Sequence, residues 1–168
     1  LKAFFHYLEL EELIDINPFH KIQIRYKEPF SLPKTIPLKD IEKIINYSYK
    51  VYNNANSENQ KIISLRNILI LELLFATGIR ISELCSLNTE DIDFNDYIIK
   101  IHGKGSKERL VQICNKSIQN LIEEYINLRQ DSDYMFSNRL KNRLSEQSAR
   151  NMIKQYTKNA GINTHITP

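Results

Sequence analysis

No apolar stretch in this sequence is long enough to cross a lipid bilayer, which takes roughly 18–20 consecutive residues. The longest, Ile68 to Ala76, is interrupted by Glu72 and is typical of a buried helix instead. The N-terminus has neither a basic segment nor the small-residue cleavage site of a secretory signal. The sequence therefore predicts neither membrane insertion nor export.

Disulfide, metal and nucleotide sites are also not indicated. Cys85 and Cys114 lie in apolar patterns without CxxC spacing, so we expect two buried free thiols in a reducing compartment, the cytoplasm. The acidic residues do not converge on a metal-ligand pattern, and no G-x-x-x-x-G-K-[ST] phosphate loop is present. We expect no metal and no cofactor.

Charge is distributed unevenly along the chain, although the net charge is only +3 over 168 residues. Residues 1–15 are acidic, whereas residues 16–37, 100–109 and 139–158 are each basic. Any one basic segment alone is as readily explained as a solvated surface. Three together favour a polyanionic partner, and we expect double-stranded DNA.

The prolines divide the chain into segments. Residues 1–14 have apolar side chains at helical spacing, and the Asn17-Pro18 step is expected to end that helix. Four prolines between residues 18 and 37 predict an extended linker. We therefore expect residues 1–17 to be the end of a preceding domain, 18–36 to be a linker, and 37–168 to form a compact domain.

The compact domain is predicted to be α+β and mostly helical, with one small three-stranded antiparallel sheet. The helix over residues 61–77 is apolar on nearly every side, so it must lie at the centre of the core, and Gly78 suits its C-terminal end. The expected elements around it are a helix from Pro37, a short helix over 81–87, a strand over 92–94, a hairpin over 97–102 and 109–113, and helices capped by Asn115 and Ser145.

Arg80 is the first candidate for chemistry. It follows the buried helix and Gly78, so rigid structure holds it, and a guanidinium matches two phosphate oxygens. Glu83, three residues on, could orient it. An ordinary surface ion pair between the two explains the spacing equally well.

Basic residues of the hairpin and of the last helix are the other candidates. Lys104 lies between Gly103 and Gly105 in the hairpin turn and could hold a phosphate or protonate a leaving oxygen, with Lys107 and Arg109 nearby as phosphate anchors. Arg150, Lys154 and Lys158 form a stripe that could lie along DNA. A flexible basic turn and a solvated helix face are the simpler alternatives.

Two motifs in this chain, ATGIRISEL (Ala76–Leu84) and IHGKGSKERLV (Ile101–Val111), closely resemble motifs of the tyrosine recombinase, or phage integrase, family, particularly of its Xer-like members. Their separation along the chain is also similar to that in the family. The resemblance extends over nearly the whole chain, from LKAFFHYLELEELIDINPF through DYMFSN to GINTHITP. It implies a partial catalytic domain over 37–168, preceded by the last helix of a core-binding domain.

The resemblance also implies roles. Arg80 would be the first catalytic arginine, Glu83 its acidic support, and Lys104 the hairpin lysine at the leaving 5′ oxygen. Family members cleave DNA with a tyrosine, need no metal or nucleotide, and exchange strands as tetramers. The alternatives are a non-catalytic DNA-binding module on the same scaffold and a helical protein-interaction domain.

The end of the chain departs from the family pattern. The family continues from a segment like HITP into an H-x-x-R box and then the nucleophilic tyrosine, whereas this chain stops at Pro168 and does not begin with methionine. We therefore expect a fragment, possessing neither the box nor the nucleophile, that is inactive alone and monomeric.

Overall fold

The computed structural model describes residues 1–22, 35–103, 105, 107–129, 132–163 and 166. Contacts divide the chain into two compact units, Leu1–Thr35 and Ile36–Pro168. The predicted linker over 18–36 falls mostly on residues 23–34, which lie outside the described residues, as does Lys104.

The described residues of the first unit form one helix, α1 (Lys2–Leu10), which ends earlier than the sequence pattern predicts. Glu12 takes a left-handed conformation, with φ of 55°. The amides of Glu12 and Leu13 donate back to the carbonyl oxygens of Glu9 and Leu8, which is the Schellman arrangement that terminates helices. The prediction that the helix runs to residue 14 and is ended by Asn17-Pro18 was therefore wrong, because the backbone reverses at Glu12.

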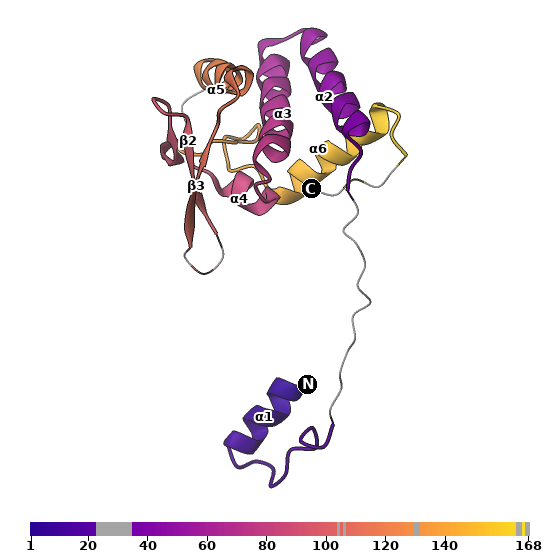
Figure 1. Cartoon of the computed structure of the whole chain (residues 1–168), viewed down its shortest axis with the longest axis vertical. Helices are drawn as coiled ribbons and strands as arrows, with labels where there is room; N and C mark the ends of the chain where they lie inside the picture. The colour runs from indigo at the N-terminus through magenta and orange to yellow at the C-terminus, as the bar shows by residue number, and fades with distance from the viewer. Residues whose placement is uncertain (23–34, 104, 106, 130–131, 164–165, 167–168) are drawn as a thin grey trace. The chain divides into compact units, whose positions relative to one another are not determined.

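The second unit is built around α3 (Glu58–Thr77), as the all-round apolar pattern predicted. Leu65, Ile68 and Leu69 are fully buried in it. Figure 1 shows α3 between α2 (Leu38–Asn53) and α5 (Lys116–Leu128), with α6 (Glu146–Asn159) crossing below. Ser57 Oγ accepts from the Gln60 amide at 3.3 Å and begins α3 three residues earlier than expected.

A small sheet follows α3 in the chain. The connection passes through α4 (Ile81–Ser86) and a 3₁₀ turn, η1 (Thr89–Asp91), into β1 (Ile92–Asp93), β2 (Ile98–His102) and β3 (Glu108–Gln112). The strands lie in the order β1-β2-β3 and all pair antiparallel. The predicted α+β class, mostly helical with one small antiparallel sheet, is confirmed for the described residues.

The two cysteines differ, contrary to the expectation that both are buried. Cys85 on α4 is buried, and burial raises the pKa of its thiol to about 11. Cys114 is exposed. It follows Ile113, which takes the inward-facing place after β3, so the next side chain faces solvent. Within the described residues, no helix combines the length and apolarity that spanning a membrane requires.

Because α3 is central to the core, we expect a leucine-to-alanine substitution in α3 to lower the free energy of unfolding more than the same substitution at an exposed leucine. Leu69→Ala should lower the free energy of unfolding by about 2–5 kcal/mol, because it leaves a cavity in the core. Leu38→Ala, at a helical position that is 70% exposed, should change it by less than about 0.5 kcal/mol. Urea unfolding of both variants checks this, and equal losses would contradict the placement of α3.

Candidate functional site

The backbone on both sides of Arg80 is anchored in the core. Gly78 ends α3 in the left-handed conformation, with φ of 61°, and so redirects the chain. Ile79 and Ile81 are buried on either side of Arg80, at 5% and 4% exposure. The Arg80 side chain itself is 76% exposed. A rigid backbone therefore presents this guanidinium to solvent at the start of α4.

The carboxylate of Glu83 is the centre of the cluster. It is 7% exposed and receives four hydrogen bonds. Arg80 donates its amide to Oε2 at 3.0 Å and its Nη1 to Oε1 at 3.1 Å. Arg109 on β3 donates Nη1 to Oε1 at 3.0 Å and Nη2 to Oε2 at 2.7 Å. The Arg80–Glu83 contact expected from the spacing is present, and Arg109 of β3 binds the same carboxylate.

These contacts stabilise the ionised carboxylate. The hydrogen bonds from Arg109 are the main cause that lowers the pKa of Glu83 to about 2, and the bonds from Arg80 act in the same direction. Burial opposes them. The end-on pairing with Arg109 uses both Nη groups, whereas Arg80 commits only Nη1 of its guanidinium. Within the described residues, the other guanidinium N–H groups of Arg80 make no hydrogen bond and face solvent.

The hairpin turn begins directly beside this carboxylate. The Gly103 amide donates to the Lys107 carbonyl oxygen at 2.7 Å and closes the turn. A Cβ at Gly103 would crowd that carbonyl oxygen, at 3.1 Å, and would lie in ordinary van der Waals contact with Glu83 Oε1, at 3.7 Å. Gly105 has φ of 77°, as the glycine-flanked turn predicted. Lys107 is exposed, and the position of Lys104 lies outside the described residues.

A second group of polar side chains fastens the turn end of the hairpin. His102, at the end of β2, lies 3.1 Å from Asp91 of η1 through Nε2 and 3.2 Å from Glu108 of β3 through Nδ1. Lys100 Nζ lies 3.0 Å from the other oxygen of Glu108. The hairpin is thus tied to η1 on one side and to α4, through Arg109 and Glu83, on the other.

The basic segment 139–158 separates into groups with different surroundings. Arg150 and Lys154 are exposed on α6, opposite the buried Ala149 and Ile153, and Arg150 pairs with Glu146 at 2.8 Å. Arg143 instead donates to the last carbonyl groups of α4 and, at 2.8 Å, to Asn88 Oδ1. Sequence reasoning counted Arg143 as part of a DNA-facing patch, but it holds α4 in place.

The sequence pattern did not reveal the contact between Arg109 and Glu83. The two residues are 26 positions apart, and only the register of β3 brings them together. The signal that could have found it is the glycine-containing turn, because a hairpin closed there pairs Arg109 with Ile101 and places Arg109 near the turn. Among the described residues, no group of three or more His, Cys, Asp or Glu side chains could hold a metal ion.

Comparison with known proteins assigns the chain to a family. The model of the phage integrase family matches residues 34–168, which is most of the chain. This chain belongs to the phage integrase family. It is 48% identical over 172 aligned residues to a tyrosine recombinase of Agathobacter rectalis, covering all of this chain and 56% of that protein. It is 34% identical to the tyrosine recombinase XerC of Thermodesulfovibrio yellowstonii, again over all of this chain and 56% of that protein.

Solved structures of this family share the fold. The XerH site-specific recombinase, crystallised on its difH substrate before cleavage, superposes with a TM-score of 0.71 at 22% identity, covering 98% of this chain and 47% of that one. The chain spans about half the length of the tyrosine recombinases that it matches. The family assignment and the fold inferred from the two motifs are confirmed.

The ionised Glu83 predicts a specific pH dependence of stability. Glu83→Gln removes the charge that both arginines contact, and at pH 7 it should cost roughly 1–3 kcal/mol. A carboxyl whose pKa is lowered on folding stabilises above its unfolded value near 4.5 and loses that stabilisation as pH falls toward 2. The difference between wild type and variant in urea unfolding should therefore shrink between pH 5 and pH 2.5. A difference that stays constant over this range would contradict the assignment.

Proposed function

We propose that this chain is the scissile-phosphate-binding part of a site-specific tyrosine recombinase, an enzyme that breaks and rejoins double-stranded DNA. The observation that carries the proposal is the arrangement at Glu83, where a buried carboxylate holds Arg80 with its remaining N–H groups toward solvent. The 48% identity to a tyrosine recombinase over the whole chain supports the same activity.

In the proposed cleavage reaction, a positively charged side chain held in a fixed position takes the place that a metal ion has in other enzymes. When a tyrosine attacks a DNA phosphate, negative charge grows on the phosphate oxygens, and preorganised donors stabilise it. A guanidinium already oriented by a carboxylate does not have to reorganise during the step. Arg80 fits this role, and Glu83 acts as a positioning residue that orients Arg80. No metal or other cofactor enters the proposal.

The hairpin would supply the second contact. Lys104, in the turn that starts beside Glu83 at Gly103, would act at the leaving 5′ oxygen, as the general acid or as a stabilising charge. Lys107 would anchor a neighbouring phosphate. Arg109 holds Glu83 with both Nη groups, so its main contribution would be to fix the hairpin against α4, and its exposed edge would face DNA.

Arg150 and Lys154 would bind the DNA backbone along α6. Both are exposed and lie on the face of α6 opposite the core. Phosphate contacts of this kind set affinity and position and carry no sequence information.

The proposal extends to organisation and assembly. Residues 1–17 would be the last helix of a core-binding domain, 18–36 the linker, and 37–168 part of the catalytic domain. The whole protein would assemble on DNA as a tetramer, as the lambda integrase does in its crystal structure on a Holliday junction. It would work in the cytoplasm, which suits the buried free thiol of Cys85.

Strand cleavage can be tested in a chimera in which this chain replaces the matching 56% of the Agathobacter rectalis recombinase. On a nicked suicide substrate, the chimera should accumulate a covalent protein–DNA complex. Arg80→Ala should lower its rate of formation by a factor of about 100 or more, because it removes a transition-state contact. Gel separation of the covalent complex measures both rates.

Lys50→Ala, an exposed cation on α2, is the matched control and should cleave like the unaltered chimera. Cleavage that survives Arg80→Ala at the control rate would refute the role of Arg80. A chimera that binds the site but never forms the complex would favour the alternative, a non-catalytic DNA-binding module.

The contacts along α6 predict a change in salt dependence. Lys154→Ala should weaken binding of the 168-residue chain to duplex DNA, and it should reduce the slope of log K against log salt by about 1. The loss should be similar for unrelated DNA sequences, because phosphates are common to all. Fluorescence anisotropy at several salt concentrations measures the slope, and an unchanged slope would place α6 away from DNA.

A further inference from the structure

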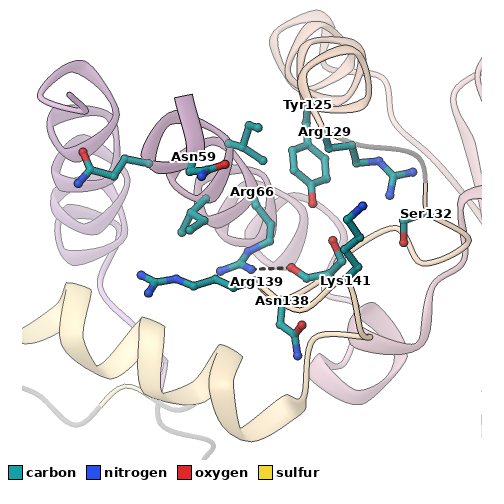
Figure 2. Close-up of a pocket in the computed structure, with 12 residues that line it drawn as sticks. Asn59, Arg66, Tyr125, Arg129, Ser132, Asn138, Arg139 and Lys141 are labelled. Carbon is teal, nitrogen blue, oxygen red and sulfur yellow. Dashed lines mark hydrogen bonds between the residues drawn. The ribbon is translucent and has the colours of Figure 1, made fainter. Parts of the chain in front are cut away.

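A pocket with a volume of about 600 Å³ lies between α3, the end of α5 and the loop over residues 132–141. Figure 2 shows four cationic side chains around it, Arg66 from α3, Arg129 after α5, and Arg139 and Lys141 from the loop. Its described lining contains no aspartate or glutamate. The volume falls in the range of small-molecule sites, roughly 300–1,000 Å³.

Arg66 carries a charge that nothing in the described part of the chain neutralises. Its Nη1 donates to the Ser137 carbonyl oxygen at 2.6 Å, and its Nη2 donates to Asn67 Oδ1 at 2.9 Å. Both acceptors are neutral. Burial is the main cause that lowers the pKa of Arg66; the positive charge of Arg139 is a smaller cause in the same direction, and Tyr125 and Tyr156 oppose both. Like charges gathered in a recess are unfavourable unless an anion joins them.

The loop presents its two cations from a fixed turn. Asn138 Oδ1 accepts from the amides of Leu140 and Asn142 at 2.8 and 3.1 Å, and the Asn138 amide donates to the Asn142 carbonyl oxygen. Lys141 is left-handed, with φ of 61°, a conformation that costs a lysine about 1 kcal/mol or more. Within the described residues, the side chains of Arg139 and Lys141 make no hydrogen bond or ion pair.

The pocket is separate from the Arg80 cluster. Arg66 lies near the middle of α3, whereas Arg80 follows the C-terminal end of that helix. From Arg66 to Thr77 alone the helix rises roughly 16 Å. A ligand in the pocket would therefore not occupy the place of the scissile phosphate.

We propose that this pocket binds a small molecule carrying two or more linked phosphate groups, such as a nucleoside di- or triphosphate. Two guanidinium forks and an ammonium group match several phosphate oxygens at once. A ligand with several negative charges offsets Arg66, Arg139 and Lys141 together, whereas a single carboxylate leaves most of their repulsion in place. Asn138 adds a neutral amide at the rim.

Isothermal titration calorimetry of the 168-residue chain with sodium pyrophosphate, and separately with ATP, tests the site at constant ionic strength. Wild type should show saturable binding at one site. Arg139→Ala should bind at least about tenfold more weakly, which corresponds to roughly 1.4 kcal/mol. Lys50→Ala, which removes an exposed cation that does not line the pocket, should bind like wild type.

The variant Lys141→Gly distinguishes a loss of ligand affinity from a loss of protein stability. Glycine adopts the left-handed conformation without strain, so this variant should unfold at the same or a higher urea concentration while losing about tenfold in pyrophosphate affinity. No saturable heat with wild type, or equal affinities for Lys141→Gly and Lys50→Ala, would overturn the proposal.

Binding of a short DNA duplex by the same variants distinguishes the source of the phosphate. A small-molecule site predicts that Arg139→Ala and Lys141→Gly lose no more duplex affinity than Lys50→Ala. If both instead lose duplex affinity in parallel with pyrophosphate affinity, the pocket belongs to the DNA-binding surface and the proposal fails.

Discussion

One buried carboxylate, Glu83, joins the start of its own helix, α4, to the β2–β3 hairpin, where Arg109 lies 26 positions further along the chain. It receives the backbone and side chain of Arg80 at the start of α4, both Nη groups of Arg109 on β3, and it lies against Gly103 at the base of the hairpin turn. Charge-assisted hydrogen bonds of this kind are roughly twice as strong as neutral ones. The relative position of the two phosphate-binding candidates, Arg80 and the hairpin turn, therefore depends on this single side chain.

The buried helix α3 is what makes that junction rigid. Its fully buried leucine and isoleucine residues fix its end at Gly78, and the buried Ile79 and Ile81 hold the chain on either side of Arg80. Core packing thus fixes the position of the Arg80 backbone, and the hydrogen bonds to Glu83 fix the orientation of its guanidinium group. A cation placed in this way can stabilise developing charge without the cost of reorganisation.

Much of this could be predicted from sequence. The all-round apolar pattern of residues 61–77, the left-handed Gly78 and the caps Ser145 and Asn115 are local signals, and each lies where it was predicted. The Schellman end of α1 was missed because a glutamate, not a glycine, takes the left-handed place at Glu12. The pairing of Arg109 with Glu83 was missed because strand register, not sequence spacing, brings them together.

The basic residues show the same limit. As a run of charge, residues 139–158 form one patch, but the folded chain uses Arg143 to hold α4, Arg139 and Lys141 to line a pocket, and Arg150 and Lys154 on an exposed helix face. Composition favours a polyanionic partner, and tertiary structure is needed to separate the cations that are available to such a partner from those that hold the fold.

A crystal structure of the chain bound to duplex DNA would test the central claim most directly. We predict a backbone phosphate within hydrogen-bonding distance of the Arg80 guanidinium, with Glu83 still bound to both arginines and the hairpin turn against the same strand. DNA bound on another face, with Arg80 left in solvent, would contradict the account.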